Sequence, residues 1–567
     1  MRFGKTTWII ILITLFGAFL RLFYLDKIPN AIGGDELNYV LTAKAIFLRG
    51  SDLTGVWNPL SILWFQYPPG PSQAELPYLT QTLVVGPLPF SLFNARVFPA
   101  LLSALTIPLL FLVTRKLLNN TTGLIAGFLL AINPWSIYIG RTSYEAVYAP
   151  FFFLAATAIL LYAKSWKLLF AIPVLLLAFY SYIGTKLIFL PFVLIICWYS
   201  YAAINHKKYK NIFLIIGAFS VLLVLYFAIF LLTGKEARTG EILLPNSPQL
   251  GLQVDALRRI SIDNPLTSLF ENKPTLFIKT ITEKLYKTFS LDYLFFSGDS
   301  FFSINRHGLF YIIDLPFIIL GLIGIFRKNR KVFYLLVSLI FLSVVPQIFH
   351  TASTSNFSHH LALMYSFVLI AAAYGVYSVS QKLHFSKLPI VICGVYLLFL
   401  LNFLQIYFFQ HSLQGYFDFN MRTLSTYANL SSQKNPTVIM TTKNAGTFQK
   451  YLFYTNGIQK STLESVEKAL TTASFKSGNV IFTECPLETQ KFKKNTVYIV
   501  DINCTLPKEA VISLAQLKDG GETYGIIHDF ICKNVVLSTY PDNIVLNDFA
   551  MEALPADRFC KAFVVKQ

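Results

Sequence analysis

The chain has 567 residues, of which 54% are hydrophobic and only 13% charged, and its mean hydropathy is +0.55. Soluble globular proteins average about 25% charged residues, so this composition excludes an ordinary soluble protein. The formal net charge of +18 does not indicate nucleic-acid binding, because the Lys and Arg residues of membrane proteins gather in cytoplasmic loops for topological reasons.

Apolar stretches of about 20 residues, the length that a helix needs to cross a bilayer, recur along the first 410 residues. They predict an α-helical multi-pass membrane protein with about eleven transmembrane helices. The predicted spans are Trp8–Leu25, Asn94–Leu117, Thr122–Ile139, Ala146–Ala163, Leu168–Ile183, Leu187–Ile204, Ile212–Leu232, Leu309–Phe326, Val332–His350, His359–Ser378 and Leu388–Gln410.

The charges of the connecting segments alternate with this count of spans. One set of connectors is short and basic, as in Arg115 and Lys116 or Arg327 to Lys331, and is predicted to be cytoplasmic together with the N-terminus. The other set holds every acid before the C-terminal region, except Asp314, which falls inside the eighth span. We therefore expect a cell-membrane protein whose C-terminal region lies outside the cytoplasm.

Residues 1–410 are expected to form the membrane domain, with two long outer loops at residues 26–93 and 233–308. The first loop is expected to contain short helices at the membrane interface. The second has the pattern of an amphipathic helix near Thr275–Phe289. Long outer loops over a helical bundle favour an outward-facing active site over a transport path.

Residues 411–567 differ in composition and predict a small soluble extracytoplasmic α/β domain. Strands are predicted at Thr437–Thr442, Val480–Cys485 and Thr496–Asn503, and a helix at Pro507–Leu517.

Four of the six cysteines fall in this C-terminal region, which is expected where disulfides can form. Two of them close predicted parallel strands, which favours Cys485–Cys504 as the first pair and Cys532–Cys560 as the second. Four cysteines allow three pairings, and the sequence does not choose among them. Cys197 and Cys393 lie inside spans and are interpreted as packing residues.

Asp35 and Glu36 are the first candidates for catalysis. They follow two glycines just outside the first span, and glycines allow a backbone to approach a ligand closely. Neighbouring carboxylates face different ways, so one can act as a base while the other anchors or orients. The alternative is that both are ordinary loop charges at the interface.

Arg141 and Glu145 lie in the tight outer turn between the third and fourth spans. If the turn enters a helix, residues four apart share one face and would form a charged pair. That pair could cap the fourth span, or it could contact a phosphate or a metal, because Arg binds phosphate oxygens well.

Further basic residues lie at the outer ends of spans. Arg21 and Arg96 are each interpreted first as side chains that extend to lipid headgroups. Lys186, in an outer turn, has the same ambiguity. His359 and His360 begin the tenth span, and two adjacent imidazoles facing one outer chamber could contact a lipid phosphate.

Several motifs, taken as an ordered set, resemble the GT-C membrane glycosyltransferases of the protein O-mannosyltransferase group, which includes the lipid A aminoarabinose transferases. The likeness covers most of Trp8 to Gln410 and weakens in the C-terminal region. The matching stretches are Ile28–Tyr39, Leu48–Asp52, Phe93–Leu101, Asn133–Trp135 through Arg141 and Glu145, Tyr293–Asp299, and Asp314–Pro316 with Gly321.

The resemblance implies a polyprenyl-phosphate-sugar donor and an inverting transfer to an extracytoplasmic acceptor, such as a protein hydroxyl, a lipid or a cell-envelope glycan. It gives Asp35 the role of general base, with Glu36 beside it. Relatives carry a His followed shortly by an Arg before the tenth span, whereas this chain has His359-His360-Leu361-Ala362. The missing Arg leaves the lipid-phosphate contact there open or moves it to His360.

The expected donor-phosphate ligands are Arg141, Lys186, His359 and His360, and the expected supporting residues are Glu145, Arg96 and Asp52. No cofactor is required, although Asp35 and Glu145 could share a divalent metal with the donor phosphate. The partners expected are the lipid-linked donor, the acceptor and membrane lipids, with no nucleic acid.

Three other functions compete with this hypothesis. A lipid-linked glycan ligase or polymerase would differ only in donor size and acceptor. A multi-pass transporter would place charges at mid-membrane and show an internal repeat. A membrane-anchored receptor would not need eleven spans. The sequence leaves open the sugar, the acceptor, the length of the lipid and the oligomeric state.

Overall fold

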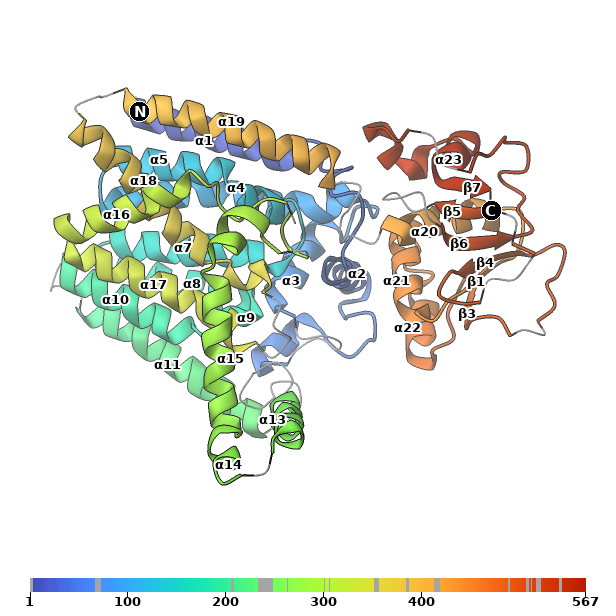
Figure 1. Ribbon diagram of the computed structural model, residues 1–567, viewed down its shortest axis with the longest axis horizontal. Coiled ribbons are helices and arrows are strands. Elements are labelled where there is room, and N and C mark those ends of the chain that lie inside the picture. Colours follow the sequence, from blue (N-terminus) through green and yellow to red (C-terminus); the bar gives the residue numbers. More distant parts are fainter. Residues whose placement is uncertain are drawn as a thin grey trace.

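The computed structural model describes residues 4–66, 73–204, 209–232, 248–262, 264–299, 301–304, 306–350, 356–383, 387–411, 419–487, 490–505, 509–510, 512–515, 522–539 and 543–566. Helices make up the part before residue 411, and a sheet flanked by helices makes up the part after residue 418 (Figure 1).

Each of the eleven predicted spans contains a helix. Six stretches of the described chain are long and apolar enough to cross a membrane, and α5, α8 and α10 are shorter apolar helices. The chain is therefore an integral membrane protein. The helices are α1 (Lys5–Leu22), α4 (Leu92–Leu117), α5 (Asn120–Ile132), α7 (Tyr148–Tyr162), α8 (Ala171–Ser181), α10 (Phe189–Ile204), α11 (Tyr209–Leu232), α16 (Asp314–Lys328), α17 (Arg330–Phe349), α18 (Met364–Lys382) and α19 (Leu388–Phe409).

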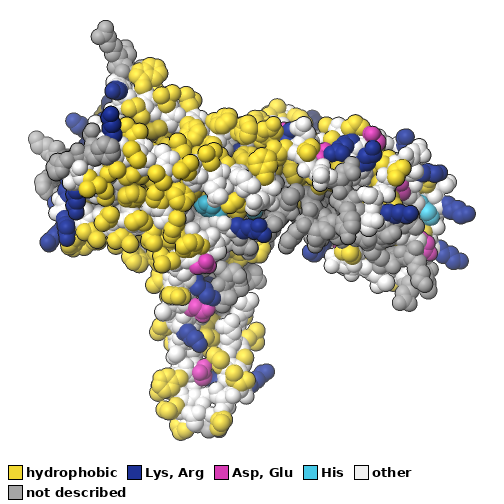
Figure 2. Space-filling view, turned by 45° about the horizontal axis from the view of Figure 1, so that its top comes forward, with side chains coloured by type: hydrophobic (Ala, Val, Ile, Leu, Met, Phe, Trp, Pro, Cys, Tyr) yellow, Lys and Arg dark blue, Asp and Glu magenta, His cyan; other side chains and the backbone are white. Residues whose placement is uncertain are grey.

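Small residues allow the bundle helices to approach closely. A Cβ atom on Gly321 of α16 would lie 1.8 Å from the carbonyl oxygen of Ala371, and one on Gly375 of α18 would lie 2.0 Å from that of Phe317. These two helices therefore pack backbone to backbone, as expected where lipid supplies no hydrophobic driving force between helices. Figure 2 shows apolar side chains over the bundle and basic ones at its end away from the C-terminal region.

Short helices are present in both long loops, residues 26–93 and 233–308, as predicted. The first loop contains α2 (Gly34–Arg49) and α3 (Glu75–Val84), and short helices α6 (Pro134–Ile139) and α9 (Ile183–Lys186) lie in later turns. The second loop contains α13 (Pro248–Ile260), α14 (Thr267–Phe270) and α15 (Lys273–Thr288). The amphipathic helix expected near Thr275–Phe289 corresponds to α15.

The C-terminal region is a mixed sheet with helices beside it, which confirms the predicted α/β class. The sheet order is β2-β3-β1-β4-β6-β5-β7, with β1 parallel to both β3 and β4, and the other pairs antiparallel. The helices are α20 (Phe419–Ser432), α21 (Asn444–Tyr454), α22 (Leu463–Thr472) and α23 (Ala556–Phe563); the strands are β1 (Thr437–Met440), β2 (Lys476–Ser477), β3 (Val480–Thr483), β4 (Val497–Asp501), β5 (Ile512–Ala515), β6 (Glu522–Ile527) and β7 (Val564–Lys566).

The predicted helix at Pro507–Leu517 is wrong in its described part, where Ile512–Ala515 form strand β5. This strand pairs with β6 on one side and β7 on the other, and Ser513 and Leu514, which point to opposite faces of the sheet, are both buried. A short apolar run that is buried on both faces shows no alternation of polar and apolar residues. Its sequence pattern therefore does not distinguish a strand from a helix.

Both favoured disulfides are present. Cys485 bonds Cys504 with a Cα–Cα separation of 5.5 Å, and Cys532 bonds Cys560 at 5.6 Å. The strands before the first pair are parallel, as predicted, but β1 lies between them. The bridge therefore crosses the carboxyl end of β1, where the Cys504 sulfur lies 3.9 Å from the carbonyl oxygen of Met440. Cys197 and Cys393 are free thiols.

Candidate functional site

Three buried arginines hold the backbone that leads to Asp35. Every carbonyl from Ile28 to Ala31 accepts a hydrogen bond from a guanidinium group. Arg141 binds Ile28 O at 2.7 Å, Arg96 binds Pro29 O at 2.6 Å and Ala31 O at 2.5 Å, and Arg422 binds Asn30 O. These arginines come from the 139–145 turn, from α4 and from α20, so three parts of the chain converge on one short segment.

Glu36 is the acid that completes this arrangement. Its fully buried carboxylate accepts from Arg96 Nε and Nη2 at 3.1 Å each, from Ser143 N at 2.7 Å and from Gly33 N at 2.9 Å. A Cβ atom on Gly33 would lie 2.3 Å from the Tyr144 hydroxyl oxygen, so a larger residue there would displace the Tyr144 side chain. With four donors bound, Glu36 orients the loop, and the structure does not favour a direct catalytic role for it.

Asp35 has a different environment, although it is the next residue. It is partly buried near the start of α2, and its Oδ1 accepts a hydrogen bond from Gln73 Nε2 at 3.3 Å. Within the described residues it forms no ion pair. Burial raises the pKa of Asp35, the Gln73 hydrogen bond lowers it, and the charge of Glu36 raises it. This carboxylate is available to accept a proton.

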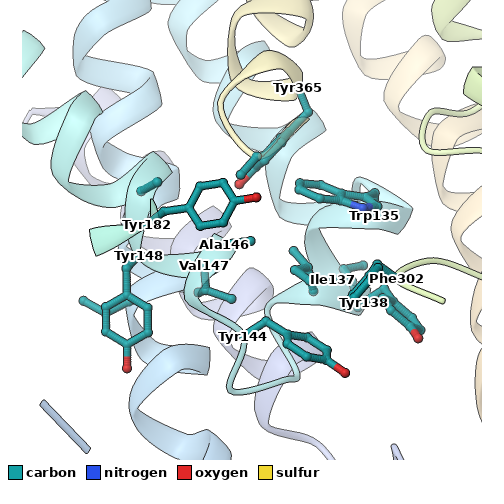
Figure 3. Packing of buried hydrophobic residues seen from close by; sticks show 14 of the residues in the cluster. Trp135, Ile137, Tyr138, Tyr144, Ala146, Val147, Tyr148, Tyr182, Phe302 and Tyr365 are labelled. Carbon is teal, nitrogen blue, oxygen red and sulfur yellow. The ribbon is translucent and has the colours of Figure 1, made fainter. Parts of the chain in front are cut away.

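Glu145 is a second acid that forms no ion pair within the described part of the chain. Its Oε2 accepts from the Tyr39 hydroxyl of α2 and from Ala74 N, the latter at 2.7 Å. Because the adjacent residues Gln73 and Ala74 hydrogen-bond Asp35 and Glu145 respectively, the two carboxylates lie in one region. Figure 3 shows the aromatic residues packed around this turn, with Tyr144 and Tyr148 beside Ala146 and Val147.

The expected pair between Arg141 and Glu145 is absent from the described structure. Arg141 is fully buried and directs its nitrogens to Leu20 O at 2.9 Å, Ile28 O at 2.7 Å and the Tyr407 hydroxyl at 3.1 Å. Residues 141–144 are not helical, so a spacing of four places the two side chains on no common face. The geometry therefore does not favour Arg141 as a phosphate ligand.

Lys186 binds an acid that the sequence interpretation missed. Its Nζ lies 2.7 Å and 2.9 Å from the two carboxylate oxygens of Glu75, and both side chains are buried. Burial raises the pKa of Glu75, and the charge and hydrogen bond of Lys186 lower it. Glu75 starts α3 directly after Gln73 and Ala74, which contact Asp35 and Glu145. An acid at a helix N-terminus in the outer loop was the available signal.

Three histidine rings lie together at the outer ends of α17 and α18. The ring centroids of His359 and His360 are 4.1 Å apart, and those of His350 and His360 are 4.6 Å apart. His360 Nδ1 lies 2.7 Å from the Tyr182 hydroxyl, and Tyr182 is within electrostatic range of Glu145 and Asp35. His359 and His360 are thus close together, and Tyr182 contacts His360. His350 was not foreseen.

Two other predicted residues have structural surroundings. Asp52 accepts from Trp57 N at 2.9 Å and from the Thr54 hydroxyl at 2.7 Å, which closes a turn in the first outer loop. Arg21 does not extend to lipid: it is fully buried and binds Ser103 Oγ and Ser136 Oγ at 2.8 Å each. The lipid-headgroup interpretation is wrong for Arg96 as well, because that side chain is buried against Glu36.

The metal hypothesis has limited support. Among the described residues, no group of three His, Cys, Asp or Glu side chains is placed to hold an ion. Asp35 and Glu145 could supply two carboxylate ligands, and a Mg²⁺-type ion commonly takes the rest from water and substrate phosphate.

The C-terminal region contacts the same loop. Arg422 joins Asn30 O to Phe549 O, and both Glu552 oxygens accept from it at 2.7 Å. The Tyr454 hydroxyl of α21 accepts from Ile32 N at 3.0 Å. The backbone just before Asp35 is therefore held from outside the membrane bundle as well as from within it.

Comparison with known proteins gives a structural likeness only. No protein-family model matches the chain, and no curated protein matches it. The Archaeoglobus fulgidus oligosaccharyltransferase complex with Zn and sulfate shares 13% identity at a TM-score of 0.48, covering 92% of this chain and 73% of that one. ArnT from Cupriavidus metallidurans bound to undecaprenyl phosphate shares 12% identity at a TM-score of 0.44, covering 92% and 98%. Values this low transfer neither residues nor activity.

Glu36→Gln is expected to destabilise the protein. The amide cannot neutralise Arg96, and removing one partner of a buried ion pair costs on the order of 3–5 kcal/mol. Thermal unfolding of the purified variant in detergent should show a clear loss of stability, and membrane abundance should fall. Asp35→Asn is the matched control, because Asp35 has no ionic partner in the described structure. Equal unfolding temperatures for Glu36→Gln and the parent protein would contradict the anchoring role.

Tyr454→Phe is expected to loosen the loop before Asp35 without unfolding the sheet. It removes the acceptor of Ile32 N–H, a hydrogen bond with a net value of about 0.5–1.5 kcal/mol. Amide exchange over residues 30–36 should therefore speed up by as much as about tenfold. Tyr451→Phe, in the same helix, removes a hydroxyl that has no recorded bond to this loop. Identical exchange in the two variants would show that α21 does not hold the loop.

Proposed function

We propose that this protein is a membrane glycosyltransferase that moves a sugar from a polyprenyl-phosphate donor to an extracytoplasmic acceptor, with inversion and with Asp35 as general base. One observation carries the proposal. Of the acids gathered above the bundle, Glu36 and Glu75 are each neutralised by a cation, whereas Asp35 and Glu145 form no ion pair within the described residues. Two nearby carboxylates without a compensating cation reduce the folding free energy, and a role in the reaction accounts for their presence.

Asp35 suits the role of base by its position and its protonation. A carboxylate about 3 Å from an acceptor hydroxyl can take the proton as the hydroxyl oxygen attacks the anomeric carbon. Burial moves the pKa of Asp35 up toward the working pH, which strengthens it as a base. General-base help of this kind contributes typically about 10²–10⁴-fold.

The leaving phosphate needs positive charge or hydrogen-bond donors at the membrane surface. His359 and His360 are the proposed donors, because they lie at the outer end of the bundle beside Tyr182, which adjoins the acids. The Nδ1 atom of His359 is buried and has no hydrogen-bond partner in the described structure. Lys186 is the further candidate, with its charge partly neutralised by Glu75. Removing one such donor typically costs about 10²–10³-fold in rate.

A divalent metal remains compatible with this proposal but is not a part of it. Asp35 and Glu145 would be its ligands, and the ion would stabilise charge on the departing phosphate. A lipid-linked glycan ligase uses the same chemistry with a larger donor, so the products of the reaction decide between the two activities.

Asp35→Asn should abolish transfer while the protein inserts normally, because an amide cannot accept the proton. Membranes from an expressing strain are incubated with radiolabelled polyprenyl-phosphate hexoses or pentoses, and labelled protein, lipid and glycan fractions are separated. Asp26→Asn is the control, since Asp26 is an exposed acid in the same outer loop. Full activity of Asp35→Asn would refute the base assignment.

The same variant makes a prediction about stability. Because burial raises the pKa of Asp35 in the folded protein, the folded state binds the proton more tightly than the unfolded chain. The contribution of the Asp35 carboxyl to the free energy of unfolding is therefore present at low pH. It is lost as the pH rises through the pKa that this carboxyl has in the folded protein. At neutral pH, Asp35→Asn should unfold at the same temperature as the parent protein or at a higher one, so inactivity would not reflect misfolding.

The proposal requires Asp35 to lie outside the cytoplasm. Reporter fusions at Arg330, the first residue of α17 after the short turn from α16, should give a cytoplasmic signal. Fusions at Asp52, in the first outer loop, should give an extracytoplasmic signal. A cytoplasmic signal at Asp52 would reverse the orientation and exclude an outward-facing transferase.

A further inference from the structure

The second outer loop forms an arm that leaves the bundle sideways. The arm consists of α13, α14 and α15, and α15 runs across the direction of the bundle helices and carries α13 and α14 away from them (Figure 1). At its base, the ring centroids of Phe277 and Phe349 are 6.3 Å apart, and Lys284 Nζ donates to His350 O at the end of α17. The arm is thus attached at the outer end of a membrane span.

The far end of the arm is apolar and uncovered. Ile260, Ile262, Leu266, Leu269 and Phe270 fall within eleven consecutive residues, and each is more than half exposed, from 58% for Leu266 to 88% for Ile262. Figure 2 shows hydrophobic side chains at the end of this projection. Isolated exposed apolar residues are ordinary, but a contiguous group of this kind marks an interaction surface.

The helices leading to this tip are amphipathic, and their inner faces are already used. Leu250 and Val254 of α13 are buried, and α13 packs on α15. The remaining apolar positions of α15 include Ile278, 64% exposed, whereas Lys279 and the Glu283–Lys287 ion pair lie on the adjoining exposed face. α13 therefore turns buried apolar residues toward protein, and α15 exposes both the apolar Ile278 and charged side chains.

We propose that the arm lies on the outer leaflet of the same bilayer and inserts its apolar tip, the side chains of Ile260, Ile262, Leu266, Leu269 and Phe270, among the lipids. A helix pair projecting sideways from the outer end of a span runs along the membrane surface, where apolar faces enter the boundary of the acyl chains and charged faces stay in water. Residues 248–288 hold six Lys or Arg and four Asp or Glu, which leaves two net positive charges for anionic headgroups. This inference uses the membrane location and is independent of the proposed activity.

The test places fluorophores on the full-length protein in nanodiscs that hold one copy each. Ile262→Cys and Leu269→Cys carry the probe at the tip, Lys279→Cys carries it on the charged face, and the unsubstituted protein corrects for the free thiols Cys197 and Cys393. Probes at the tip should be quenched several-fold more by lipids with a quencher in the acyl chain than the probe at position 279. Aqueous iodide should give the reverse order.

Each other outcome overturns the proposal. Tip probes open to iodide would show a tip in water, available to a separate protein partner. Tip probes shielded from both quenchers would show that it packs on protein. A photoactivatable phospholipid provides a second measurement on the unsubstituted protein, in case a labelled variant folds poorly. Adducts should map to residues 260–270, and their absence there would refute insertion.

Discussion

The structure depends on how the backbone of Ile28–Ala31 is held. Four successive carbonyl oxygens accept from Arg141, Arg96 and Arg422, and each of these guanidinium groups is fully or almost fully buried. Burying a charge costs several kcal/mol unless acids and hydrogen-bond acceptors compensate it. Glu36 compensates Arg96, and Glu552 compensates Arg422. Arg141 is compensated by the backbone carbonyls and the Tyr407 hydroxyl that accept its hydrogen bonds. The loop carbonyls therefore compensate the buried arginines, and the arginines in turn hold the loop backbone in place.

The acids near this loop are of two kinds, those that bind a cation and those that do not. Glu36 and Glu75 are bound by Arg96 and Lys186, and their charge is used in holding the fold. Asp35 and Glu145 accept only neutral hydrogen bonds in the described structure, from Gln73, Tyr39 and Ala74 N. A fold under selection for stability alone gains by replacing such acids with neutral residues, and for that reason we propose that Asp35 and Glu145 act in the reaction.

The elements that sequence reasoning predicted correctly depend on local composition. Apolar stretches and basic connectors are visible within short windows, and the eleven helices followed from them. The two disulfides match the favoured pairs, although four cysteines alone allow three pairings. The site contacts that were missed join distant residues: 60 positions separate Glu36 from Arg96, 111 separate Glu75 from Lys186, and 392 separate Asn30 from Arg422. Residue type also misled, because arginines near span ends were assigned to lipid or phosphate, whereas backbone carbonyls bind them.

These long-range contacts bear on what the C-terminal region is for. A soluble domain that only recruited an acceptor could hang from a linker, with few contacts to the bundle. Here α20 and α21 instead bond to Asn30 O and Ile32 N, three to five residues before Asp35. Arg49 of α2 also pairs with Glu467 of α22. A shift of this region would therefore move the loop and α2 together. The position of the C-terminal region and the geometry of the backbone before Asp35 therefore depend on the same contacts.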